Sequence, residues 1–166
     1  MKLTSERGTS ILEATVATCV LLVAATGMLG VHTQQVRQNA DARRITEATA
    51  LAQDLVENIT LWSFTDPRLS NVNKGNDADI GDVAQQFETD PPPYDHAEAD
   101  LALGTWNGLP ARPGFERYWN VAYVDDYDKN GVWDAVRIAV VVRWRSGAAW
   151  RRVVLLTTKS NPAEVQ

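Results

Sequence analysis

The chain has 166 residues, of which 45% are hydrophobic and 22% charged, as is usual for one folded domain and unlike a disordered chain. The net charge of -5 argues against nucleic-acid binding, because phosphate recognition requires a basic surface. The two histidines, His32 and His96, are far apart in the sequence, which argues against a histidine-based zinc site or a catalytic triad. Cys19 is the one cysteine, so no internal disulfide can form. We therefore do not expect an enzyme.

A short polar segment, residues 1–8, precedes an apolar run at residues 11–31. The run has about the 20 residues that a helix needs to cross the hydrocarbon core of a bilayer. The segment carries Lys2 and Arg7, which would keep the N-terminus on the cytoplasmic side. A secretory signal peptide is cleaved after its apolar run, whereas the natural cleavage point here, Gly8, comes before it. Cleavage there would leave the membrane helix on the mature protein.

Glu13 is the one full charge within the apolar run. A carboxylate inside a membrane span costs at least a few kcal/mol, and such a residue by default has a function and a partner. The alternative interpretation is that Glu13 lies near the start of the helix and reaches the water at the membrane interface.

Residues 8–13, Gly-Thr-Ser-Ile-Leu-Glu, and the apolar run after them resemble the class III signal of type IV pilins and of type II secretion pseudopilins. The resemblance implies cleavage by prepilin peptidase between Gly8 and Thr9, N-methylation of the new amine of Thr9, and subunit docking through Glu13. Thr9 departs from the phenylalanine or methionine that usually begins the mature chain. In a filament, the α-ammonium of one subunit would neutralise Glu13 of its neighbour, since an unpaired buried charge is heavily penalised.

The helical pattern continues beyond the apolar run. Residues 34–62 contain no proline or glycine and are rich in good helix formers. Apolar residues recur at alternating spacings of three and four, at Ile45, Ala48, Ala52, Leu55, Ile59 and Trp62. We therefore predict one helix over residues 9–62, with 11–31 in the membrane and the second half packed on a globular head at 63–166; the stripe could instead be a partner surface.

Residues 50–57, Ala-Leu-Ala-Gln-Asp-Leu-Val-Glu, resemble a segment of the PilV-type minor pilins and, more loosely, of the GspI-type pseudopilins. This second resemblance implies a minor, low-copy subunit rather than a major pilin.

Residues 63–114 lose the helical pattern and are rich in Asn, Asp, Gly and Pro, with a proline triplet at 91–93. The family's variable loop would occupy this place. Nine acidic and two basic residues lie between Asp66 and Asp100, whereas nine basic and five acidic residues lie between Arg112 and Lys159. Such runs either face water or form complementary patches that help subunits to dock.

A C-terminal sheet is expected over residues 115–160. Segments 118–124, 135–144 and 150–158 are rich in β-branched and aromatic residues, and 146–149 reads as a turn. Three or four antiparallel strands on the amphipathic half of the helix would give an α+β fold, the fold of the pilins. Arg137, Arg143 and Arg145 share one parity, so we expect their face of the sheet to meet water.

The loop between the first two of these strands matches the calcium-loop pattern, with Gly131 at its sixth position. The candidate ligands are Asp126, Asp128, Asn130, the carbonyl of Val132, and Asp134. The usual bidentate glutamate at the twelfth position is missing, because Arg137 stands there. The alternative is that Asn130–Gly131 is a tight hairpin turn with solvated acids around it.

The sequence as a whole predicts a minor pilin, a structural subunit that helps to initiate or cap a type IV pilus and catalyses nothing. The expected partners are other major and minor pilins, prepilin peptidase, the inner-membrane assembly platform and a tip adhesin, with no nucleic acid; calcium is the possible cofactor. The expected location is the inner membrane before assembly and the extracellular filament afterwards. Two alternatives remain: a GspI-like pseudopilin of a type II secretion system, and a single-pass membrane-anchored binding or adhesive module.

Overall fold

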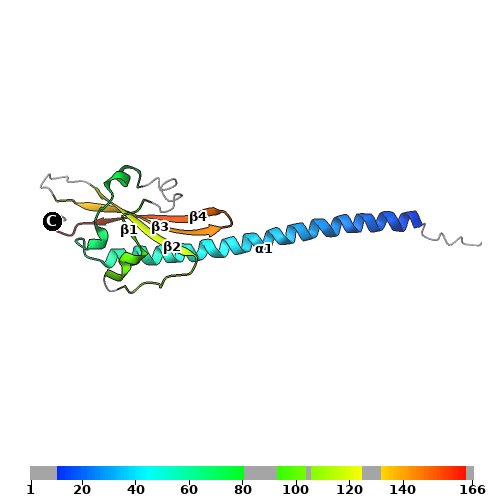
Figure 1. Ribbon diagram of the computed structural model, residues 1–166, viewed down its shortest axis with the longest axis horizontal. Helices are drawn as coiled ribbons and strands as arrows, with labels where there is room; N and C mark the ends of the chain where they lie inside the picture. Colours follow the sequence, from blue (N-terminus) through cyan, green and yellow to red (C-terminus); the bar gives the residue numbers. More distant parts are fainter. Residues whose placement is uncertain (1–10, 81–92, 104–105, 125–131, 164–166) are drawn as a thin grey trace, which may run out of the picture. The chain divides into compact units, whose positions relative to one another are not determined.

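The computed structural model describes residues 11–80, 93–103, 106–124 and 132–163, with one long helix, three short 3-10 helices and four strands (Figure 1). The chain divides into two compact units, Met1–Arg43 and Arg44–Gln166, called here the N-terminal unit and the C-terminal unit. The boundary falls inside the long helix, so each unit contains part of it.

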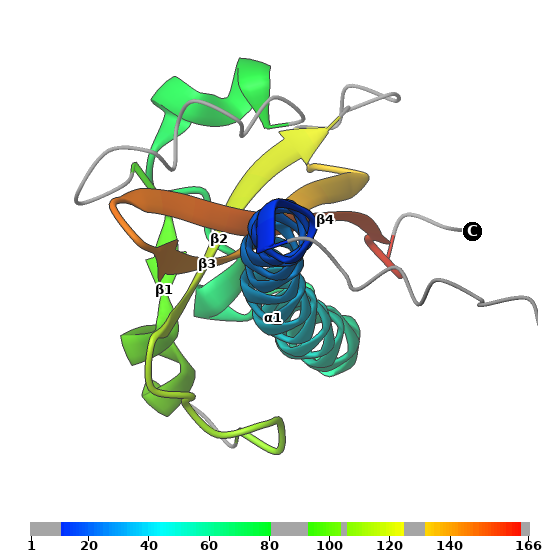
Figure 2. The ribbon, with the colours of Figure 1, turned by 90° about the vertical axis from the view of Figure 1, so that its right-hand side faces the viewer.

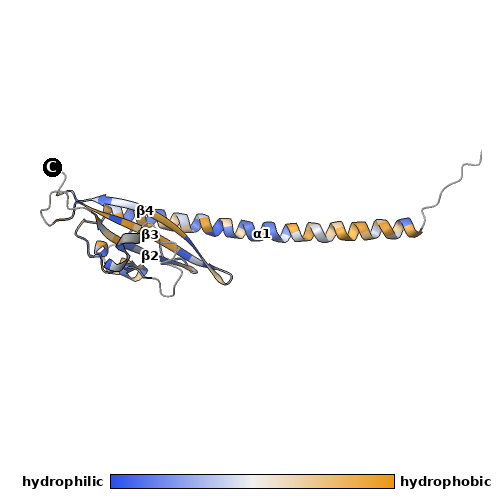
Figure 3. Ribbon diagram, turned by 90° about the horizontal axis from the view of Figure 1, so that it is seen from above, coloured by the Kyte–Doolittle hydropathy of each residue, from blue (hydrophilic) through white to orange (hydrophobic). Residues whose placement is uncertain are grey.

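The long helix is α1 (Ile11–Leu61), in the region where the sequence predicts helix over 9–62. Figure 3 shows apolar residues gathered toward its N-terminal end and polar residues in its middle. Its last turn has no basic residue. Lys159, on the last strand of the chain, supplies a cation there instead. Its Nζ donates to the carbonyl oxygens of Ile59 (3.4 Å) and Thr60 (2.7 Å). A cation here favours the helix, because the carbonyl groups at the C-terminal end have no partners within it.

The sheet lies wholly in the C-terminal unit and has the order β1-β2-β3-β4, with every neighbouring pair antiparallel. The strands are β1 (His96–Ala97), β2 (Phe115–Val124), β3 (Ala135–Ser146) and β4 (Ala149–Ser160). The three longer strands contain the predicted ones, and β1 and β4 form the two edges (Figure 2). The expected turn at 146–149 is confirmed, and Gly147 has a φ of 65°, which a two-residue hairpin loop requires at this position.

The main core lies between α1 and one face of the sheet. The apolar stripe of α1 contributes Ala48, Leu51, Ala52, Leu55 and Ile59, each at most 1% exposed. Alternate residues of β3 meet it: Val136, Ile138, Val140, Val142 and Trp144. This arrangement confirms an α+β fold in which the second half of the helix packs on an antiparallel sheet. It confirms that the stripe is core from Ala48 to Trp62, whereas its first predicted member, Ile45, is 49% exposed.

The opposite face of the sheet is not the solvent-facing surface that the arginine parity predicts. Arg137 and Arg145 are exposed, but Arg143 between them is 1% exposed. Ala139 and Val141 on the same face are buried in a second, smaller core that includes Ile80. The prediction was wrong because Ile80 and Tyr94 pack against Ala139 and Val141, and Trp150 stacks on Arg143, which parity within a single strand cannot reveal.

Residues 62–114 contain more regular structure than the sequence indicates. Three 3-10 helices occur there, η1 (Pro67–Leu69), η2 (Lys74–Asp79) and η3 (Glu98–Leu103), together with β1. Asp95, which is 8% exposed, connects this segment to the sheet. Its carboxylate accepts hydrogen bonds from the backbone N–H groups of Val72, Asn73 and Val121. Burial raises the pKa of Asp95, and these hydrogen bonds oppose the rise.

Candidate functional site

The described part of the N-terminal unit is an exposed, apolar helical surface. Residues 11–47 of α1 are all exposed. By length and composition, α1 is the one helix of the described residues that could cross a membrane. Its large exposed side chains up to residue 31 are Ile11, Leu12, Val16, Val20, Leu21, Leu22, Val23, Met28, Leu29 and Val31. A soluble monomer rarely exposes so many contiguous apolar groups, so this surface needs lipid or protein around it.

Threonine hydroxyls in this stretch are satisfied within the helix. Thr15 and Thr18 donate to the carbonyl oxygens of Ile11 and Ala14, each at 2.8 Å. Thr26 bonds in the same way, to the residue four positions before it. Because these hydroxyl groups have partners inside the helix, the threonines do not prevent it from entering an apolar environment.

Glu13 lies in the first turn of α1 as the structure describes it. Within the described residues, no hydrogen bond or ion pair of its carboxylate is found, and the apolar residues Ile11, Leu12 and Val16 near it are exposed. The other two residues of the predicted signal, Gly8 and Thr9, lie outside the described residues. Within the described residues, Glu13 is therefore a charge beside exposed apolar side chains and without a partner.

The predicted calcium loop lies mostly outside the described residues, since Asp126, Asp128 and Asn130 fall at 125–131. Val132 is exposed, and the carbonyl oxygen of Asp134 accepts a hydrogen bond from the N–H of Asn161 at 2.7 Å. Among the residues that the structure does describe, no group of three His, Cys, Asp or Glu side chains could hold a metal ion. Calcium binding stays a prediction.

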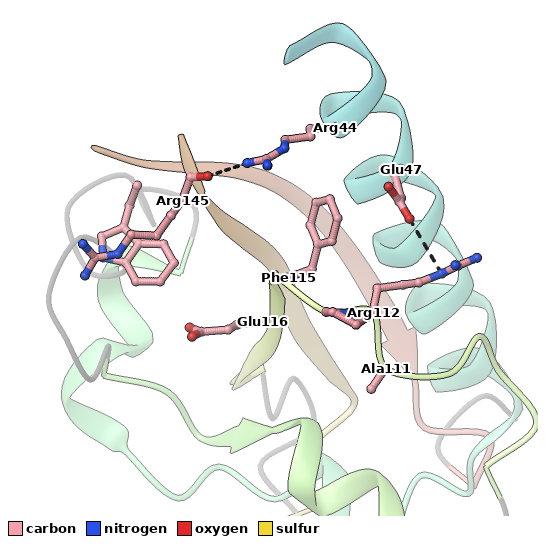
Figure 4. Close-up of a pocket in the computed structure, with 10 residues that line it drawn as sticks. Arg44, Glu47, Ala111, Arg112, Phe115, Glu116 and Arg145 are labelled. Atoms are coloured by element: carbon pink, nitrogen blue, oxygen red, sulfur yellow. Dashed lines mark hydrogen bonds and ion pairs between the residues drawn. The ribbon is translucent and has the colours of Figure 1, made fainter. Parts of the chain in front are cut away.

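A groove of about 850 Å³ opens in the C-terminal unit, between α1, the turn before β2 and the β3–β4 hairpin. It is lined by Arg44, Glu47, Ala111, Arg112, Pro113, Gly114, Phe115, Glu116, Arg145 and Trp150. Nη1 of Arg44 donates to the carbonyl oxygen of Arg145 at 2.6 Å, and Nε of Arg112 lies 3.7 Å from Glu47. Figure 4 shows the ring of Phe115 between the helix that carries Arg44 and the strand that carries Arg145.

Two residues that line this groove, Glu116 and Trp150, contact the buried side chain of Arg143. Nη2 of Arg143 lies 2.7 Å from Oε2 of Glu116, and its guanidinium stacks 3.9 Å from the ring centre of Trp150. Arg145 stacks on the same ring at 4.7 Å. Burial and the hydrogen bond to Glu116 raise the pKa of Tyr118 to about 12, so this tyrosine stays neutral beside the ion pair.

The chemistry of the groove is that of a mixed polar and apolar surface. Its lining combines three arginines and two glutamates with aromatic and proline side chains, which suits a ligand that carries both polar and apolar groups. The lining residues include no serine, cysteine or histidine that could serve as a nucleophile or general base. Sequence reasoning missed the groove because its sides come from segments about 30 to 100 residues apart in the chain.

No protein-family model matches this chain, and no similar curated protein or solved structure is found.

Proposed function

We propose that the chain is a minor pilin, a structural subunit that helps to initiate or cap a type IV pilus. The observation that carries the proposal is Glu13, a carboxylate without a partner among the described residues, in the first turn of an exposed apolar helix. Its position five residues after Gly8 is the spacing of the pilin class III signal.

The architecture supports this proposal in coarser terms. An exposed apolar stretch and an amphipathic stretch lie on one continuous helix, and the amphipathic stretch covers an antiparallel sheet. Prepilin peptidase would cut between Gly8 and Thr9 and leave the helix on the mature subunit. In the filament, Glu13 would then meet the α-ammonium of the neighbouring subunit, and the two charges would neutralise each other in apolar surroundings.

The test is the N-terminus of the mature protein. The full chain is produced in cells with and without a prepilin peptidase, and the membrane-extracted protein is analysed by intact mass. We expect the loss of residues 1–8 in the presence of the peptidase only, and a Gly8→Leu variant should remain uncut. Gly27→Leu, a change at a glycine within α1, is the control and should be cut normally. A chain that still begins at Met1 in the presence of the peptidase would contradict the proposal.

A second candidate function, a membrane-anchored binding module, is favoured by the arginine-rich groove of the C-terminal unit. Such a module needs the apolar helix only as an anchor. It would therefore remain uncut by the peptidase. The same mass measurement on the wild-type chain separates the two functions, because only the pilin would lose residues 1–8.

A further inference from the structure

The two edges of the sheet differ greatly in length. The edge formed by β1 consists of two residues, His96–Ala97, whereas β4 spans twelve, Ala149–Ser160. Among the described strands, β4 pairs with β3 alone. Proteins usually protect a long edge strand, because its outward N–H and C=O groups are a template for another strand. The edge at β4 is therefore the place where an added strand would bind.

The hairpin that joins β3 and β4 determines which backbone groups of β4 point outward. Ser146 pairs with Ala149 across a two-residue loop, and such a closing pair exchanges hydrogen bonds in a hairpin of this type. Hydrogen-bonded pairs then alternate along the ladder. The N–H groups directed away from β3 consequently belong to every second residue of β4: Trp150, Arg152, Val154, Leu156 and Thr158.

The side chains along this edge are suited to contact with another strand. The four central residues, 153–156, are all apolar. Three of them are half-buried, and Leu156 is 58% exposed. A hollow of about 210 Å³ lies beside this stretch, lined by Ile80, Arg137, Leu156, Thr157 and Thr158. A strand added to β4 would cover the apolar centre, and the hollow could take one of its side chains.

The charge of β4 narrows the choice of partner. The strand carries Arg151, Arg152 and Lys159 and no acidic residue. Pairing of β4 with β4 of a second copy would bring two strands of the same positive charge together, and like charges on neighbouring strands are destabilising. Since Lys159 is bound to the end of α1, the complementary partner is a strand with an apolar centre and acidic residues beside Arg151 and Arg152.

We propose that β4 is a docking edge for an extended, acidic β-strand of a different polypeptide, recognised by backbone hydrogen bonds through the N–H groups of Val154 and Leu156. Arg151 and Arg152 attract the acidic residues at one end of the docked strand, and the apolar centre of β4 packs against the middle of that strand. The docking edge does not depend on the proposed function, because an anchored binding module would possess it equally.

The test uses the full chain in detergent micelles and a fluorescent twelve-residue peptide with alternating valine and threonine at its centre and glutamates at both ends. Fluorescence anisotropy gives its Kd. We expect binding, and at least about tenfold weaker binding of the same peptide with lysines in place of glutamates. Absence of binding by the glutamate peptide at millimolar concentration would overturn the proposal, as would equal binding of the two peptides.

Two substitutions separate the edge from other surfaces. Leu156→Pro removes an outward N–H without removing a bond to β3, so the Kd should rise about tenfold or more, while Leu156→Val keeps the N–H and should bind nearly as wild type. Equal binding by the proline and valine variants would overturn the proposal. If circular dichroism shows that Leu156→Pro is unfolded, the variant Arg151→Glu serves as the test. Position 151 is exposed, so a glutamate there should weaken binding of the glutamate peptide and strengthen binding of the lysine peptide. An unchanged preference between the two peptides would overturn the proposal.

Discussion

The buried charged groups of the C-terminal unit and Glu13 of the N-terminal unit differ in whether a partner is present among the described residues. In the C-terminal unit, buried charged groups have partners from the same chain: Arg117 pairs with Glu98, Arg143 with Glu116, and Asp95 accepts backbone N–H groups. In the described part of the N-terminal unit, the carboxylate of Glu13 has no such partner, and the apolar side chains around it are exposed.

This difference separates structural charges from functional ones. A charge that is satisfied within its own unit contributes to the fold, and removing it should change stability. A charge without a partner in an apolar stretch contributes nothing to the described fold, and removing it should change assembly. The predictions below test this contrast, beginning with the largest expected effect.

Glu13→Ala should leave the protein in the membrane but exclude it from filaments. Without the carboxylate, the α-ammonium of the neighbouring subunit would be buried unpaired, a penalty of about 3 kcal/mol or more, so incorporation should fall on the order of a hundredfold. Membrane fractionation and immunoblotting of sheared filaments measure both quantities. Thr15→Ala, on the same helix, is the control and should be incorporated normally. Normal incorporation of Glu13→Ala would make Glu13 an interfacial residue only.

Arg117→Ala should destabilise the C-terminal unit by about 2–3 kcal/mol, because it removes the buried member of an ion pair whose carboxylates are partly exposed. Arg117 lies 2.6 Å from Glu98 and 3.8 Å from Asp54, and its side chain is 2% exposed. Arg112→Ala is the matched control, since the Arg112 side chain is 53% exposed in its pair with Glu47, and it should cost less than about 1 kcal/mol. Urea denaturation measures both, and equal losses would contradict the contrast between buried and exposed pairs.

Calcium, if it binds at residues 126–134, should stabilise the C-terminal unit by about 2.7 kcal/mol at a hundred times its Kd. For a protein of this size, the melting temperature would rise by several degrees relative to a solution with chelator. Asp128→Ala should abolish the shift, whereas Asp77→Ala, outside the predicted loop, should preserve it. Equal melting temperatures in millimolar calcium and in EDTA would leave Asn130–Gly131 as a hairpin turn.

The smallest expected effect concerns pH. The hydrogen bond from Arg68 lowers the pKa of Asp66, so the unfolded chain binds the proton more readily than the native one. The stabilisation is therefore present above the unfolded pKa of about 3.9 and is lost as the pH falls through the lower native pKa. Asp66→Asn should cost about 1 kcal/mol at pH 6 and much less near pH 2. A cost that is the same at both pH values would show that the ion pair contributes nothing.

Local patterns in the sequence were enough for the elements that follow a simple period. The stripe from Ala48 to Ile59 and the β-rich segments that became β3 and β4 could be read directly, because each repeats along a short stretch of chain. The burial of Arg143 could not, because the side chains in contact with it, Glu116, Tyr118 and Trp150, come from the neighbouring strands β2 and β4. Strand β1 has two residues, too few for any alternation to be visible.

The candidate site divides in the same way. Glu13 could be identified because it is the one full charge in a long apolar run, a property of local sequence. The arginine-rich groove could not, since Arg44, Arg112 and Arg145 meet only after the helix, the turn before β2 and the hairpin have come together. The carboxylate of Asp95 was missed for a similar reason, because its hydrogen-bond donors lie more than 20 residues away on both sides.

The bond between Lys159 and the end of α1 has a consequence for the order of folding during synthesis. It joins residues 99 and 100 positions apart, Thr60 and Ile59 on the helix and Lys159 near the end of β4. The ribosome makes the helix before the strand, so the cation at the C-terminal end of α1 is translated about 100 residues after the carbonyl groups that it binds. Contacts of such long sequence separation form late and slow the folding reaction. We therefore expect the final turn of α1 to become stable only after β4 has emerged and paired with β3.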